Sequence, residues 1–222
     1  MIDWSALLLS FQVACAGTLA ALVVGVVVAG VLSSSRSWAR DVVDALVTAP
    51  LVVPPTVLGY YLLVMLGRNS PLGKAFEALT GTTIVFTRTG VVVAAFVGAL
   101  PLIVKSARAA MEQVDPRLIG AARTLGAGPL RVFVTVVLPL AHSGIAAGAA
   151  LGFARSLGDF GVTLMIAGNI AGLTRTASLS IYDAVMGGRD SDANGLAALM
   201  TALAIVALTL ANRLTRRSSH DF

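Results

Sequence analysis

Hydrophobic residues in this chain come in long unbroken runs that are separated by short polar segments. Five runs are long enough to cross a hydrocarbon core of roughly 30 Å as helices, at about 1.5 Å per residue. They cover residues 7–32, 45–66, 84–104, 132–153 and 195–213. Barrel strands would instead alternate polar and apolar positions over about ten residues. The pattern therefore predicts an all-α, polytopic membrane protein with five transmembrane helices in a single domain, 1–222.

A sixth apolar run, Phe160 to Ala171, is shorter than the other five. It has twelve residues and contains Gly161, Gly168 and Asn169. Runs of this length are typical of re-entrant or interfacial segments. We expect such a segment here, and a sixth span stays open as the alternative.

Composition and charge agree with a membrane protein and indicate its orientation. The chain is 57% hydrophobic and 12% charged, with a mean hydropathy of +0.88. If the N-terminus lies outside, ten of the sixteen Lys and Arg residues fall on the inner side and six on the outer side. The positive-inside rule then predicts N-outside, C-inside. Basic residues that are spread over loops with few aromatics do not indicate nucleic-acid binding.

The second hydrophobic run contains three prolines, Pro50, Pro54 and Pro55. Each proline removes a backbone donor and crowds the preceding turn, so we expect the helix to break. Freed carbonyl groups in a membrane must face protein or water. The break is thus either a kink that serves packing or part of a pathway lined by Pro54, Pro55 and Thr56.

The stretch "ARSLGDFGVTLMIAGN" follows the fourth run. Arg155 and Asp159 are one helical turn apart and are expected to pair. The pair is either an ion pair at the membrane surface or an element of a gate in an ion pathway. Further polar side chains near this predicted pathway are Ser156, Thr163 and Asn169.

Between the third and fourth runs, the segment 115–131 predicts two short helices joined by a glycine elbow. Asp115 is a suitable cap for a helix that starts with Pro116, and Gly126 is a suitable terminator for it. Pro129 would begin the second helix. Ala121, Ala122 and Leu125 form a small apolar stripe between arginines, which favours docking to another protein over lying on the membrane surface.

These residues also carry a family resemblance. The spacing of Ala121, Ala122, Gly126, Leu138 and Pro139 resembles the "EAA" loop of ABC importer permeases, with Gly120 where the family has glutamate and Val136 where it has isoleucine. The stretches "PLVVPPTVLGYYLL", "LGFARSLGDFGVTLMIAGN" and "TRTASLSIYDAV" look like the molybdate branch. Sulfate/thiosulfate and tungstate permeases have similar signatures.

The resemblance implies a transport subunit in the plasma (inner) membrane of a prokaryote. It implies a homodimer, a cytoplasmic ATPase dimer that grips the loop, and an extracytoplasmic binding protein that delivers a tetrahedral oxyanion, in the first place molybdate. The implied coupling residues are Gly120, Ala121, Ala122, Arg123, Leu125, Gly126, Pro129, Leu138 and Pro139. The chain lacks the G-x-x-x-x-G-K-[ST] phosphate loop, so ATP and Mg are expected on the ATPase and no cofactor on this chain.

Two other classes fit the sequence less well. An ion-coupled secondary transporter usually has ionisable residues within its spans and often an internal repeat, and neither is evident. A membrane enzyme needs a convergent catalytic set, whereas the chain has two histidines and one cysteine. We therefore expect neither catalytic residues nor a metal site.

Overall fold

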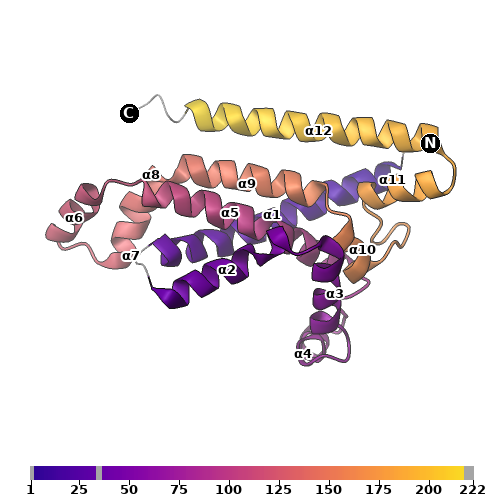
Figure 1. Cartoon of the computed structure of the whole chain (residues 1–222), viewed down its shortest axis with the longest axis horizontal. Helices are drawn as coiled ribbons and strands as arrows, with labels where there is room; N and C mark the ends of the chain where they lie inside the picture. Colours follow the sequence, from indigo (N-terminus) through magenta and orange to yellow (C-terminus); the bar gives the residue numbers. More distant parts are fainter. Residues whose placement is uncertain (1–2, 34–36, 218–222) are drawn as a thin grey trace.

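The computed structural model describes residues 3–33 and 37–217, with the backbone alone for 210–217. All regular elements in these ranges are helices, which confirms the predicted all-α class. Four long helices run along the length of the molecule (Figure 1): α1 (Trp4–Ser33), α5 (Arg88–Glu112), α9 (His142–Leu157) and α12 (Asp190–Arg217). By length and composition, α1, α5 and residues 190–209 of α12 could each cross a membrane.

The core lies where α1 and α9 pack closely against α5. Gly17 of α1 lies so near Ala95 of α5 that a Cβ atom at position 17 would come within 2.5 Å of the Ala95 side chain. A Cβ atom on Gly148 of α9 would come within 2.8 Å of Ser106 of α5. Ile103 of α5 is fully buried between them. Small residues at these crossings bring the helix backbones together, as is common in membrane helix bundles.

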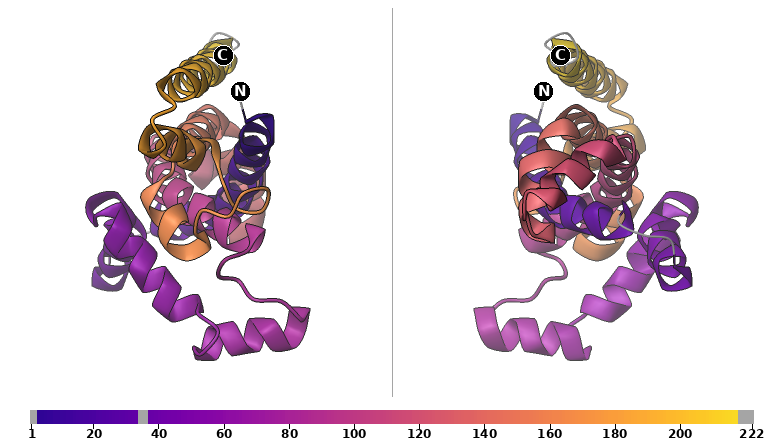
Figure 2. Two further views of the ribbon diagram at one scale, coloured as in Figure 1. Left: turned by 90° about the vertical axis from the view of Figure 1, so that its right-hand side faces the viewer. Right: turned by 90° about the vertical axis from the view of Figure 1, so that its left-hand side faces the viewer.

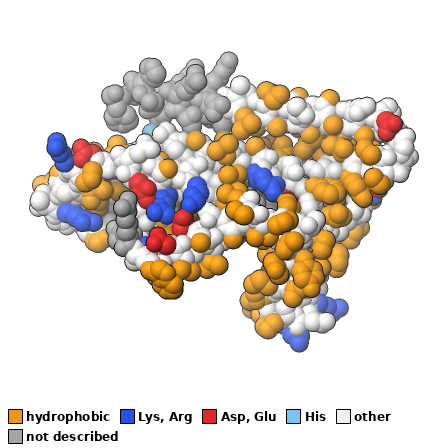
Figure 3. All heavy atoms as spheres, in the orientation of Figure 1, with side chains coloured by type: hydrophobic (Ala, Val, Ile, Leu, Met, Phe, Trp, Pro, Cys, Tyr) orange, Lys and Arg blue, Asp and Glu red, His pale blue; other side chains and the backbone are white. Residues whose placement is uncertain are grey.

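The second hydrophobic run is broken at Pro54 and Pro55, as predicted, whereas Pro50 lies inside an unbroken helix. Helix α2 (Trp38–Val52) ends before Pro54, and α3 (Pro55–Leu66) begins at Pro55 with a bend of 118° between the two. A bend of this size turns the chain back on itself, so α3 does not continue in the direction of α2. Helix α3 and the following α4 (Pro71–Thr80) form an arm that leaves the bundle sideways (Figure 2). Hydrophobic side chains cover much of the arm, and cations lie near its tip (Figure 3).

The fourth run is not one straight helix over 132–153. It consists of α7 (Pro129–Val132), a π-helix η1 (Phe133–Val137) and α8 (Leu138–Leu140), followed by α9 after a bend of 71°. Pro139 lies just before this bend and supplies no backbone donor, and π-turns are a further common cause of kinks. Within the described residues, three helices could each span a membrane, or up to five spans exist if each bent pair counts as one.

The short sixth run forms α10 (Gly161–Ala167). Seven residues make a helix of about 10 Å, which is far too short to cross a membrane. Helix α10 packs against α3 and α5, and Ile166 and Ala167 are completely buried. The chain then passes through α11 (Ala177–Met186) into α12, and at the opposite end of the molecule α6 (Pro116–Thr124) projects from the bundle (Figure 1).

Candidate coupling surface and translocation pocket

The loop between α5 and α7 folds as its local sequence predicts. Asp115 caps α6, because its Oδ1 accepts a hydrogen bond from the Arg117 backbone amide at 2.8 Å. Gly126 ends the helix with a φ of +82°, a conformation that side-chain-bearing residues rarely adopt. The amides of Gly126 and Ala127 bond back to the carbonyls of Arg123 and Ala122 at 3.0 and 3.1 Å. This is a Schellman termination, which fixes the direction of the elbow.

The tip of the loop exposes apolar side chains. Leu125 is 88% exposed and Leu130 is 76% exposed. Ala121 is exposed as well, whereas Ala122 is half-buried. A Cβ atom on Gly120, where the resembling family has glutamate, would meet no atom within 4 Å. The predicted coupling residues 120–129, together with Leu130, thus form a projecting knob, residues 120–130, that no other described part of the chain covers.

Leu138 and Pro139 lie apart from this knob. Leu138 packs against the cluster that contains Ala29, Met111 and Ala141, and Pro139 belongs to the bend before α9. Their position links the loop to the long helix that follows; Leu138 is half-buried, whereas Pro139 is exposed but lies outside the knob.

An apolar cleft of about 480 Å³ lies behind the knob, a feature that the sequence did not indicate. The ends of α1 and α5 form one wall, and α6, α7 and η1 form the other. Arg123 is its cation, and Gly30 and Phe133 touch across it so closely that a side chain at position 30 would displace the ring.

A second cavity, of about 300 Å³, unites four of the predicted pathway residues. Pro55 and Thr56 come from the start of α3, while Arg155 and Asp159 come from the end of α9 and the turn after it. The remaining lining residues are Gly158, Phe160 and Gly161. Residues that are about one hundred positions apart in the chain thus meet at the break after α2, beside Pro54. We call this cavity the break pocket.

The predicted ion pair within the break pocket is confirmed. Arg155 Nη1 lies 3.2 Å from Asp159 Oδ1. The other carboxylate oxygen, Oδ2, accepts hydrogen bonds from the Thr163 amide at 2.9 Å and from the Thr163 hydroxyl at 2.7 Å. Asp159 is therefore fixed at the start of α10, where donors and the helix dipole both favour a negative charge.

Four predicted pathway residues do not line the break pocket, and one of them, Pro54, immediately precedes α3 beside it. The Ser156 hydroxyl is buried and donates to the Ala95 carbonyl oxygen at 2.8 Å, which ties α9 to α5. The Thr163 hydroxyl donates to Asp159 Oδ2, and Asn169 accepts a hydrogen bond from Arg175 Nε at 2.8 Å. Ser156 and Thr163 thus hold structure beside the pocket in place, whereas Asn169 bonds to Arg175, which lines a different cavity.

Two glycines seat the start of α3 on α10. A Cβ atom on Gly59 would come within 2.7 Å of the Met165 side chain, and one on Gly161 within 2.8 Å of Pro55. No larger residue fits at either position without movement of the backbone. The close approach that glycine permits therefore shapes one wall of the break pocket.

Ion pairs attach helix α2 to α5, a contact that the sequence analysis missed, and Val47 of α2 also packs against the cluster that contains Val104 and Ala107 of α5. None of the residues of α2 is buried. Asp44 Oδ2 lies 2.6 Å from Lys105 Nζ, and Asp44 Oδ1 lies 3.3 Å from Arg108 Nη1. Arg108 also pairs with Glu112 at 2.7 Å. Asp44 and Lys105 are 61 positions apart in the sequence, so no local pattern indicates this network.

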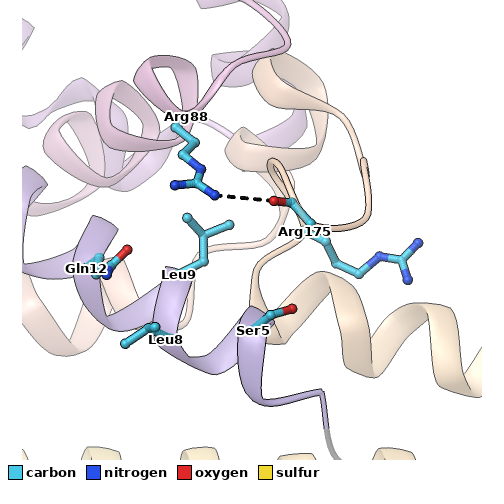
Figure 4. Close-up of a pocket in the computed structure, with 7 residues that line it drawn as sticks. Ser5, Leu8, Leu9, Gln12, Arg88 and Arg175 are labelled. Atoms are coloured by element: carbon cyan, nitrogen blue, oxygen red, sulfur yellow. Dashed lines mark hydrogen bonds between the residues drawn. The ribbon is translucent and has the colours of Figure 1, made fainter.

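A third cavity of about 190 Å³ lies at the other end of the bundle (Figure 4). Arg88 points toward the Gly172 carbonyl oxygen and donates to it at 3.3 Å, whereas the Arg175 side chain points away. Nearby, a hydrogen bond from the Ser5 hydroxyl is the largest of the effects that lower the pKa of Asp3, and the charge of Arg175 acts in the same direction. The remaining lining residues are Leu8, Leu9, Gln12 and Ser5. In the part of the chain that is described, no three His, Cys, Asp or Glu side chains gather as metal ligands.

A helical bundle with long apolar helices, a broken helix beside a cavity that holds an ion pair, and a projecting loop is the arrangement expected of a membrane transport subunit. The chain belongs to the family described as "Binding-protein-dependent transport system inner membrane component", whose model matches residues 21–221. It is 41% identical to the "Molybdenum transport system permease protein ModB" of Escherichia coli K12, over 97% of this chain and 95% of that protein. The protein of the same description from Azotobacter vinelandii is also 41% identical, over 93% and 91% of the two chains.

Solved structures of importers share the fold. A chain of the MetNI methionine ABC transporter, in inward-facing conformations, superposes with a TM-score of 0.75 at 19% identity and covers 96% of this chain and 94% of its own. A chain of a bacterial alginate ABC transporter, in complex with an alginate pentasaccharide-bound periplasmic protein, gives 0.77 at 16% identity, over 97% and 79%. The fold is thus that of ABC importer membrane subunits.

Proposed function

We propose that this chain is the permease of an ATP-driven ABC importer that moves molybdate into the cytoplasm. The observation that carries the proposal is the 41% identity to molybdenum transport permeases, because it extends over almost the whole of both chains. The break pocket adds a cavity with a cationic side chain, which suits the passage of an oxyanion.

In this proposal the knob formed by residues 120–130 docks to a cytoplasmic ATPase dimer, which binds ATP and Mg. Exposed Leu125 and Leu130 support this role, because large apolar side chains at a projecting tip are stabilised when a protein partner covers them. Force on the knob passes directly to α5 and, through the bend at Pro139, to α9. The chain itself performs no catalysis.

The working unit is a homodimer with its two-fold axis along the membrane normal. The arm supports this arrangement, because Tyr60, Tyr61, Val64 and Met65 of α3 are each more than half exposed. A second copy would cover this surface, and a closed two-fold pair is the common solution for such self-association. The two break pockets would then contribute to one pathway between the copies.

The N-terminus lies outside and the C-terminus inside. The excess of Lys and Arg on the side of α6 supports this orientation, and it places the ends of α1 and α5 that carry the Arg88 cavity on the outer face. An extracytoplasmic oxyanion-binding protein would dock on this face and carry most of the discrimination between anions.

The proposal is tested by uptake into proteoliposomes that contain the permease and its ATPase, with ATP inside and the binding protein outside. We expect radiolabelled molybdate to enter only with ATP, and an excess of sulfate or thiosulfate not to compete. Uptake that follows an ion gradient without ATP would instead indicate a secondary transporter. Preferential uptake of sulfate or tungstate would change the assigned substrate but would still agree with an ABC importer permease.

A further inference from the structure

The ion pair in the break pocket is unequal in its exposure. The Arg155 side chain is 34% exposed, whereas that of Asp159 is 3% exposed. Both residues line the cavity, and they are its only charged residues. A small ligand in the cavity therefore meets the guanidinium before it meets the carboxylate.

Asp159 has little capacity left for further interactions. Its Oδ2 is bonded twice by Thr163 and its Oδ1 faces Arg155. The carboxylate is thus shared between Thr163 and Arg155, while the guanidinium keeps donors that Asp159 does not occupy. Among the residues that the structure describes, Asp159 is the one ion-pair partner of Arg155, and it is bonded through Nη1.

The opposite wall supplies a hydroxyl group. Thr56 lines the cavity and is exposed, and its side-chain hydroxyl has no hydrogen-bond partner within the described residues. Pro55 beside it has no backbone donor and stands against Gly161, which keeps the start of α3 in place. A guanidinium and a hydroxyl that face one small cavity are suitable donors for a tetrahedral oxyanion.

We propose that Arg155 and Thr56 form a weak contact site for the oxyanion on its way through the permease, and that Asp159 keeps this site weak. The inference rests on the proposed function and adds residues that contact the anion within the membrane. Weak binding is needed because an anion that enters a pathway must also leave it. An unpaired arginine in a partly apolar cavity would hold a dianion too long.

The test is equilibrium binding of radiolabelled molybdate to the permease–ATPase complex in nanodiscs, without the binding protein. Asp159→Asn keeps an oxygen acceptor for Thr163 but removes the charge next to Arg155. We expect it to bind molybdate about tenfold more tightly than the wild type, the least effect expected when an opposite charge a few ångströms away is lost. The double variant Arg155→Gln/Asp159→Asn should lose this gain.

Uptake provides the second measurement. Arg155→Gln should lower ATP-dependent uptake at least tenfold, while Arg155→Lys should retain a substantial part of it, since a positive charge remains. Arg189→Gln is the matched control, because Arg189 is also paired with an aspartate but lies outside the break pocket. If Asp159→Asn fails to assemble, the comparison of ATP-dependent uptake between Arg155→Gln and Arg155→Lys tests the proposal instead.

Unchanged affinity in Asp159→Asn, a gain that persists in the double variant, or equal loss of uptake in Arg155→Lys and Arg155→Gln would each overturn the proposal. Failure of the proposed function looks different, because the wild-type complex would then show no ATP-dependent molybdate uptake. Normal wild-type uptake that Arg155→Gln leaves unchanged refutes the contact site alone.

Discussion

Replacing Gly126 by leucine separates the role of the knob in docking from its role in folding. Gly126 has a φ of +82°, so leucine would be strained by about 1–2 kcal/mol. No atom lies within 4 Å of the added Cβ, so no clash inside the chain increases this cost. Such a loss is small beside a total stability of about 5–15 kcal/mol. We therefore expect Gly126→Leu to fold, but to present a bulky side chain where the ATPase would dock.

The assay is co-purification with the ATPase followed by titration of the complex. Gly126→Leu should weaken association at least tenfold, about 1.4 kcal/mol, and abolish uptake. Gly81→Leu is the control, because Gly81 ends α4 with a φ of +71° and also has open space around its Cβ. Gly126→Asn, which tolerates the same backbone conformation, should retain more association. Equal ATPase binding by Gly126→Leu and Gly81→Leu would show that the knob is not the docking site.

Three other substitutions probe the remaining structure. Gly148→Leu should lower the melting temperature strongly, or prevent folding, because even a Cβ atom there comes within 2.8 Å of α5 and overpacking costs about 1–3 kcal/mol or more. Asp44→Asn should lower the free energy of unfolding by about 1 kcal/mol or less, because its two cationic partners are partly exposed. It should nevertheless reduce the number of molybdate ions imported per ATP hydrolysed. An unaltered ratio of transport to hydrolysis would contradict a coupling role. In a background without Cys15, Thr56→Cys should react with a water-soluble thiol reagent in a nucleotide-dependent way, whereas Ala94→Cys, which is fully buried, should stay inert.

Features that depend on neighbouring residues were predictable from the sequence. The cap at Asp115, the turn at Gly126 and the pair of Arg155 with Asp159 each require only the spacing of a few residues along the chain. The break at Pro54 belongs to the same group, because a missing donor acts on its own turn. Local sequence is therefore sufficient to predict the main features of the coupling loop, the Arg155–Asp159 ion pair and the helix break at Pro54.

Directions and distant contacts were not predictable in the same way. Hydropathy measures how apolar the run 132–153 is, but carries no information about the 71° bend before α9. It also cannot show that α3 turns by 118° to build an arm, or that Asp44 meets Lys105. The fit of Pro55 against Gly161 depends on the backbone positions of two remote segments, which the residue types alone do not fix.

The distribution of packing indicates where such a subunit bends during transport. Helices α1, α5 and α9 touch through glycines that leave no room for sliding, so they should move as one body together with the knob. Helix α2 buries none of its residues and is held by ion pairs, while α3 is seated on α10 through Gly59 and Gly161. Movement of the knob against the arm must then be taken up between α2 and α3, where the prolines have already removed the helical hydrogen bonds. The break pocket lies at this junction, so its shape should change with the nucleotide state of the ATPase, and the contact between Arg155 and the anion with it.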